Sequence, residues 1–86
     1  MYQIKFKASA DKRFSKLPKE VQIRIIQKLE FFLSQPDPLI FAEILTNPRI
    51  GTYRFRVGDY RVVFDLEDNE IIVIVDIDHR KDIYRR

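Results

Sequence analysis

Apolar and polar residues alternate at the start of the chain. In residues 2–7, YQIKFK, the apolar side chains Tyr2, Ile4 and Phe6 are separated by polar ones. A period of two is typical of a strand with one buried face. The pattern therefore predicts a first strand over these residues.

The period changes to that of a helix directly afterwards. Ser9 is a residue type that suits an N-cap. Apolar residues then follow at helical spacing, at Ala10, Phe14 and Leu17. We therefore predict a short first helix that ends before Pro18.

A second, longer helix is predicted to begin at Pro18. Proline fits the first helical position because its missing N–H would have no partner there. In the run VQIRIIQKLEFFL, residues 21–33, the apolar side chains form a continuous stripe at spacings of three and four. Pro36 and Pro38 then prevent the helix from extending much beyond Ser34.

The second half of the chain contains three runs rich in β-branched and aromatic residues. They are TYRFRV (52–57), YRVVFDL (60–66) and IIVIVDI (71–77), separated by turn residues at Gly58-Asp59 and at 67–70. These runs predict a three-stranded meander. We interpret residues 37–51, before them, as a connector with one helical turn from Ile40 to Leu45.

The predicted element order is therefore β-α-α-β-β-β. Helices grouped before a meander indicate an α+β fold, in which an antiparallel sheet carries a helical hairpin packed on one face. A chain of 86 residues can bury only one core, so we expect a single domain over residues 1–86.

The Gly58-Asp59 pair determines how the first two strands of the meander face each other. A two-residue turn with glycine first is typical of a type II′ hairpin. In that register Arg56 faces Arg61, and strand alternation places Arg54 on the same side. The sequence thus predicts one basic face, with the aromatic residues of both strands on the other side.

The next turn is expected to bring an acid onto this face. Whether the turn has two or four residues, it sets Leu66 opposite Ile71. In the same register Arg61 faces Asp76. Asp76 either relieves the crowding of the arginines as an ion-pair partner, which we favour, or orients Arg61 for a ligand. The same alternation adds Arg80 to the basic face.

Composition narrows the classes of site and partner. The chain has 16 Lys and Arg against 13 Asp and Glu, and its net charge of +3 favours an anionic partner without requiring one. It has no cysteine and one histidine, and no spaced cluster of carboxylates, so we expect neither a metal site nor a cofactor. No stretch approaches the ~18 apolar residues of a membrane span. We therefore expect a cytoplasmic protein without membrane contacts.

The opposed arginines need an explanation, because like charges facing each other across antiparallel strands cost up to roughly 1 kcal/mol. One interpretation is that the arginines only solvate an open sheet face. The other is a phosphodiester site, since guanidinium groups match phosphate oxygens and RNA carries its own nucleophile in the 2′-OH. The candidate proton carriers are then Tyr84, Lys81 and the lone His79, unless His79 has only a structural role.

These residues resemble a known family. The motifs YRFRVGDYRV (53–62) and HRKDIY (79–84) look like the C-terminal half of the RelE/ParE superfamily of type II toxins, and LPKEVQIRIIQKLEFFL (17–33) resembles its helical hairpin. The resemblance implies a RelE-like fold and a neutralising RelB-like antitoxin as partner. It also implies contact with operator DNA only through the antitoxin complex. In RelE-like members it implies metal-independent cleavage of mRNA on the ribosome by 2′-OH attack on the adjacent phosphate.

The resemblance also assigns roles to individual residues. Its catalytic positions match Arg61, Arg80, Tyr84 and His79, and its basic positions after the tyrosine match Arg54 and Arg56. Together with Lys81, these two arginines are the predicted phosphate ligands. The sequence departs from the family in two places. Some members have lysines where this chain has Arg54 and Arg56, and many have a glycine before the HR motif, where Asp76 and Asp78 lie in this chain.

Two alternatives to RNA cleavage remain open at this point. The ParE-like branch of the superfamily shares the arginine-rich hairpin but poisons DNA gyrase. A degenerate toxin would act only as a binding module for its antitoxin and the operator.

Overall fold

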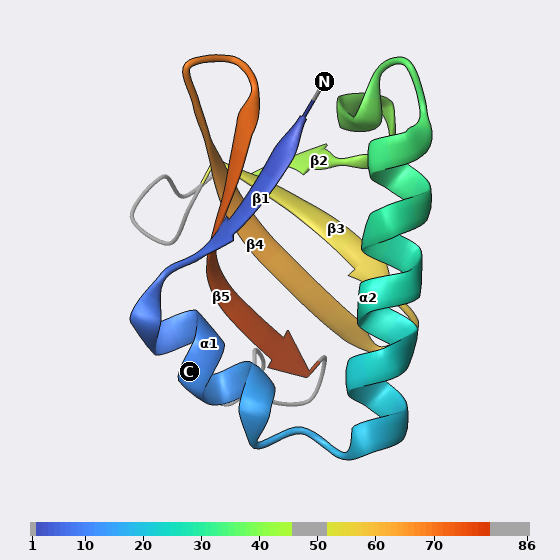
Figure 1. Ribbon diagram of the computed structural model, residues 1–86, viewed down its shortest axis with the longest axis vertical. Helices are drawn as coiled ribbons and strands as arrows, with labels where there is room; N and C mark the ends of the chain where they lie inside the picture. Colours follow the sequence, from blue (N-terminus) through green and yellow to red (C-terminus); the bar gives the residue numbers. More distant parts are fainter. Residues whose placement is uncertain (1, 46–51, 80–86) are drawn as a thin grey trace.

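A sheet and two helices form the part of the chain that the structure, a computed structural model, describes, namely residues 2–45 and 52–79 (Figure 1). The elements in chain order are β1 (Gln3–Phe6), α1 (Ala8–Ser15), α2 (Lys19–Ser34), the 3₁₀ helix η1 (Pro38–Phe41), β2 (Glu43–Ile44), β3 (Tyr53–Val57), β4 (Tyr60–Glu67) and β5 (Ile71–His79). The strands are arranged in the order β1-β5-β4-β3-β2. This arrangement confirms the predicted α+β fold.

Both helices pack on the same face of the sheet (Figure 1). Helix α1 lies against β5, and α2 lies against β3 and η1. The helices contribute Ala10, Ile25, Leu29 and Phe32 to the core, and the strands contribute Phe55, Val57, Val62, Phe64, Ile72, Ile74 and Ile77. The stripe predicted on the second helix is therefore the face that it buries, and the opposite side of the sheet is left without a helix in this part of the chain.

The first strand corrects the prediction of an all-antiparallel sheet. β1 pairs in parallel with β5, with Gln3 opposite Ile71 and Phe6 opposite Ile74, while the other pairs are antiparallel. No tight turn joins β1 to its neighbour, so hairpin chemistry does not set its direction. Parallel neighbours are joined through a long connection, which here contains the helices.

The helix boundaries differ from the prediction by one or two residues. Helix α1 begins at Ala8 with Lys7 as its N-cap, so Ser9 lies inside the helix and does not cap it. Pro18 is the N-cap of α2 and accepts hydrogen bonds from Val21 and Gln22 through its carbonyl oxygen. The predicted end at Ser34 is confirmed.

The connector after α2 contains more structure than predicted. The helical turn lies at Pro38–Phe41, earlier than expected, and begins where the Asp37 carboxylate accepts a hydrogen bond from the Leu39 N–H, 3.2 Å away. Strand β2 follows and pairs with β3, with Glu43 opposite Arg54. A strand of two residues is too short to show an alternating pattern, so no pattern of apolar and polar residues predicted it.

Candidate functional site

The hairpin of β3 and β4 has the predicted register. Arg56 lies opposite Arg61, and Arg54 lies opposite Val63. At the turn, Gly58 has a φ of 62°, a value that favours glycine, as the first position of a type II′ turn requires. We use the name arginine face for the side of β3 and β4 that carries Arg54, Arg56 and Arg61.

The other side of the same hairpin is the core. Phe55, Val57, Val62 and Phe64 are buried there, and the rings of Phe55 and Phe64 stack with centroids 4.5 Å apart. The aromatic residues of the motif therefore hold the sheet against the helices. They do not offer a stacking surface for RNA bases on the arginine face.

The predicted pairing of β4 with β5 is wrong by one residue next to the turn. Glu67, and not Leu66, lies opposite Ile71, because the loop between the strands has three residues, 68–70. Asp68 and Asn69 both have positive φ there, of 52° and 59°. The shift places Ile72 and Ile74 in the core, where they are fully buried.

A β-bulge farther along β5 shifts the pairing a second time. The partner of Phe64 is Ile74 and the partner of Val63 is Asp76, so Val75 has no partner. A bulged residue changes which side the following side chains take. Asp76 therefore lies on the arginine face, as predicted, but opposite Val63. The residue opposite Arg61 is Asp78, so the predicted pairing of Arg61 with Asp76 is wrong.

Glu43 on the edge strand β2 binds two arginines of this face. Its Oε2 atom lies 2.7 Å from Nη2 of Arg54, and its Oε1 atom lies 2.8 Å from Nε of Arg56. The hydrogen bond from Arg54, together with the charges of Arg54, Arg56 and Arg61, lowers the pKa of Glu43. Glu43 is therefore ionised at neutral pH. Sequence reasoning missed it because only the pairing of β2 with β3 brings it to the arginines.

Arg54 is only partly satisfied by this contact. Its side chain is 23% exposed, and its buried Nε atom has no hydrogen-bond partner among the described residues. A buried donor without a partner is costly, so an anion that could approach Nε would be favoured.

Arg13 of helix α1 binds the two acids of β5. A single nitrogen, Nη1, lies 2.7 Å from Oδ1 of Asp78 and 3.1 Å from Oδ1 of Asp76. Asp78 is almost fully buried, with a side-chain exposure of 3%, and Asp76 is 17% exposed. The ion pair that we expected between β4 and β5 is thus made by a helix.

Arg61 differs from the other two arginines of the face. Within residues 2–45 and 52–79 it forms no ion pair shorter than 4.0 Å and no side-chain hydrogen bond. It is partly buried between β3 and β5. Of the three predicted site arginines that the structure describes, Arg61 is the one whose guanidinium group forms no ion pair or hydrogen bond among the described residues.

The structure does not place His79 on the arginine face. His79 is opposite Tyr60, at the end of β5 and on the core side of the sheet, where the two rings meet edge to face with centroids 4.9 Å apart. Arg80, Lys81 and Tyr84 lie outside the described residues. The structure therefore brings together Arg54, Arg56 and Arg61, and leaves the predicted proton carriers untested.

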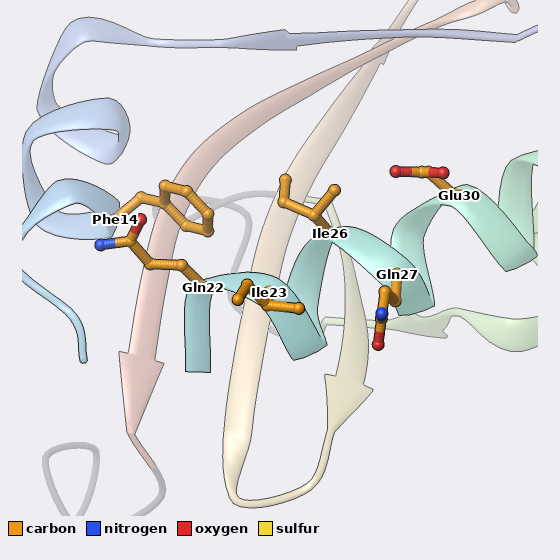
Figure 2. Close-up of a pocket in the computed structure, with 6 residues that line it drawn as sticks. All are labelled: Phe14, Gln22, Ile23, Ile26, Gln27 and Glu30. Atoms are coloured by element: carbon orange, nitrogen blue, oxygen red, sulfur yellow. The ribbon is translucent and has the colours of Figure 1, made fainter. Parts of the chain in front are cut away.

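A shallow groove lies on the helices, away from the arginine face. It has a volume of about 350 Å³, and Figure 2 shows its lining of Phe14 from α1 and Gln22, Ile23, Ile26, Gln27 and Glu30 from α2. The lining is mainly apolar, so the groove offers little chemistry. In residues 2–45 and 52–79, no three His, Asp or Glu side chains are grouped so that they could hold a metal ion. None of the described helices is long and apolar enough to cross a membrane.

Comparisons with known proteins relate nearly the whole chain to toxins of one family. Residues 4–84 match the family model of the ParE toxin of the type II toxin–antitoxin system parDE. The chain belongs to this toxin family. It is also 33% identical to the toxin RelG of Mycobacterium tuberculosis over 99% of this chain and 98% of that protein.

Solved structures of toxin–antitoxin complexes contain chains with the same fold. The RelBE2 complex of Mycobacterium tuberculosis has a chain with a TM-score of 0.74 and 28% identity, covering 92% of this chain and 98% of its own length. The archaeal RelE–RelB complex of Pyrococcus horikoshii has one with a TM-score of 0.69 and 26% identity, covering 92% and 94%. This toxin therefore has the RelE-like fold and is the toxin component of a type II toxin–antitoxin system.

Proposed function

We propose that this toxin is an endoribonuclease that cuts mRNA on the ribosome. The observation that carries the proposal is the guanidinium of Arg61, which forms no ion pair among residues 2–45 and 52–79 and is partly buried on a basic face beside Arg54 and Arg56. A guanidinium in that position is suited to bind a phosphodiester, because its planar fork matches phosphate oxygens and it stays charged at any physiological pH. The similarity to RelG and to the RelE-type chains supports the same activity.

The proposed reaction is attack by a 2′-OH of the RNA on the neighbouring phosphate. The bond from phosphorus to the 5′ oxygen breaks, and the products are a 2′,3′-cyclic phosphate and a 5′-OH. Negative charge accumulates on the phosphorane in the transition state, and fixed cations aimed at that charge are the main protein contribution. We assign this role to Arg61 and Arg80, with Arg54, Arg56 and Lys81 binding the flanking phosphates.

Proton transfer in this reaction needs one group to take the proton of the 2′-OH and another to protonate the leaving oxygen. Arginine is a poor choice for either task, so we retain Tyr84 and His79 as the candidates. Because His79 lies against Tyr60 on the core side, it can act only if the RNA passes around the end of β5. Tyr84, the other candidate, lies outside the described residues.

The partners follow from the proposed activity. The similar chains in RelBE2 and in the Pyrococcus complex are described together with RelB-type antitoxins, so we propose a RelB-like antitoxin for this toxin. We further propose that the toxin acts on ribosomes in the cytoplasm and meets operator DNA only through its antitoxin complex.

The proposal is tested with the antitoxin-free, folded toxin in a purified translation system. Primer extension on the translated mRNA should reveal new 5′ ends at positions within the codons that were cut on the ribosome. Intact mRNA in the presence of folded toxin would refute the proposal.

A second candidate function is poisoning of DNA gyrase, because the family model that matches the chain is that of the ParE toxin. A supercoiling assay with purified gyrase tests it directly. Accumulation of cleaved DNA would favour this function, whereas toxin that neither cuts mRNA nor traps gyrase would be a binding module for its antitoxin.

A further inference from the structure

Arg13 lies on helix α1, outside every motif that pointed to the arginine face, yet it contacts Asp78, which lies opposite Arg61, and Asp76. It is separated from Asp78 by 65 positions in the sequence, and its Nη1 atom lies 2.7 Å from the Asp78 carboxylate. We propose that Arg13 is a positioning residue of the phosphate site, which holds Asp76 and Asp78 so that Arg61 stays available for a phosphate. The inference rests on the proposed function.

The first step of the argument is the pairing of the strands. Asp78 lies directly opposite Arg61 in the β4–β5 ladder. Side chains at opposed positions have Cβ atoms about 4.5–5.5 Å apart, and opposite charges at such positions usually pair. Here the Asp78 carboxylate lies against Arg13, and no contact with Arg61 shorter than 4.0 Å is formed.

The second step is burial. Asp78 and Asp76 are 3% and 17% exposed, so water screens their charges poorly. Two poorly screened carboxylates beside Arg61 would repel a phosphate unless a cation faces them. Arg13 supplies that cation from a half-exposed position, with its side chain 51% exposed.

The third step is a contrast within the same face. Among residues 2–45 and 52–79, the acid of β2, Glu43, forms ion pairs only with arginines of the face itself, namely Arg54 and Arg56. The acids of β5 bind a cation from outside the face, Arg13, and in the same part of the chain Arg61 forms no ion pair. The presence or absence of an outside cation explains which arginines are occupied.

The experiment measures binding of a short single-stranded RNA by fluorescence anisotropy and cleavage in the purified translation system. We expect Arg13→Ala to weaken RNA binding and to reduce cleavage about tenfold, because a cation that faces Asp76 and Asp78 is removed and the charge of Asp78, opposite Arg61, then competes with phosphate for that guanidinium. The matched control is Lys12→Ala, which removes the same charge from an exposed position on the same helix and should change both by less than about twofold.

A second variant separates positioning from a purely structural role. Asp78→Asn weakens the same contact with Arg13 but also removes the acid that would occupy Arg61. We expect its RNA binding to be unchanged or stronger, and we expect Asp76→Asn/Asp78→Asn to cancel the defect of Arg13→Ala. If Arg13→Ala and Asp78→Asn instead weakened binding alike, the contact would be only structural and the inference would be overturned.

A third measurement does not depend on RNA at all. In ¹⁵N-labelled protein the Arg61 side-chain N–H signal should move downfield in Arg13→Ala, as a new ion pair with Asp78 forms. An unmoved signal in a folded variant would overturn the inference even if wild-type toxin cuts mRNA. Wild-type toxin that neither binds nor cuts RNA would instead refute the proposed function.

Discussion

The two ends of the arginine face carry the same types of charge but differ in which charges are neutralised. At the end formed by β2 and β3, Glu43 binds Arg54 and Arg56. At the end formed by β4 and β5, Arg13 binds the acids, and Arg61 forms no ion pair within the described part of the chain. The number of arginines on a face therefore does not measure the positive charge that it offers. The positive charge that the face offers depends on which cation forms an ion pair with each neighbouring acid.

The largest expected effect comes from removing the β-bulge at Val75, which places Asp76 and Asp78 at the end formed by β4 and β5. Deleting Val75 would turn every later residue of β5 to the opposite side, which places Asp76 and Asp78 toward the core and Ile77 outside. Burying two carboxylates without Arg13 costs several kcal/mol, comparable to the whole stability of a small domain at about 5–15 kcal/mol. We expect no cooperative unfolding transition by circular dichroism.

Val75→Ala is the control for this deletion, because it keeps the bulged residue and shortens only a partly buried side chain. The Val75→Ala substitution should lower the free energy of unfolding by about 1 kcal/mol or less. A deletion variant that unfolds cooperatively near the wild-type temperature would show that the bulge does not set the position of the two acids.

The next effect distinguishes the arginines of the two ends. Arg61→Ala should reduce the rate of mRNA cleavage about 100-fold, equivalent to ~2.7 kcal/mol of transition-state stabilisation. Arg56→Ala should reduce the rate of mRNA cleavage about tenfold or less, because the Arg56 guanidinium is already bound by Glu43 and the side chain is 57% exposed. Primer-extension time courses with equal amounts of folded toxin measure both.

Arg24→Ala, on the exposed surface of α2, is a matched control for these two substitutions and should leave the rate unchanged. If Arg56→Ala proved as damaging as Arg61→Ala, the division of the face into an occupied and an uncommitted end would be wrong.

A smaller effect is expected from removing the Glu43 carboxylate, which binds Arg54 and Arg56. Glu43→Gln removes the carboxylate that competes with phosphate for Arg54 and Arg56, so we expect RNA binding to strengthen about threefold to tenfold. The dependence of affinity on salt should also become steeper, since more cations contact phosphates. Fluorescence anisotropy at several salt concentrations measures both quantities.

Glu67→Gln is the matched control, since Glu67 is an exposed acid of β4 that contacts none of the three arginines. Weaker binding by Glu43→Gln would mean that Glu43 holds Arg54 and Arg56 in place for the RNA, which is the opposite role.

The sequence predicted one hairpin of this face well and the other poorly, for a physical reason. In β3–β4 the glycine at position 58 allows few turn types, so the turn determines the register. In β4–β5 the residues after Glu67 suit loops of two, three or four residues, and the bulge lies in a run of uniformly β-branched residues. The two irregularities compensate, which is why Asp76 was expected on the correct side but with the wrong partner.

The ion pairs of the site could not be predicted from the sequence, for a different reason. Charge and alternation identified Arg54, Arg56 and Arg61 as one group, because these residues belong to a single hairpin. The partners Glu43 and Arg13 come from an edge strand and a helix, and only the tertiary fold brings them to the face. Local patterns predict which side a residue takes, but not which distant side chain neutralises it.

The smallest expected effect is a dependence of stability on pH that comes from Glu43 at the end formed by β2 and β3. The arginines lower the pKa of Glu43 in the folded protein, so its contribution to stability is present at neutral pH. It is lost as the pH falls below the unfolded-state value of about 4.3 and through the lower folded-state value. Urea unfolding should therefore show wild type slightly more stable than Glu43→Gln at pH 7, with the difference shrinking toward zero at pH 3. In an Arg54→Ala/Arg56→Ala background the same substitution should show little such trend, and a difference that persisted unchanged at pH 3 would mean that the ion pairs do not stabilise the folded state.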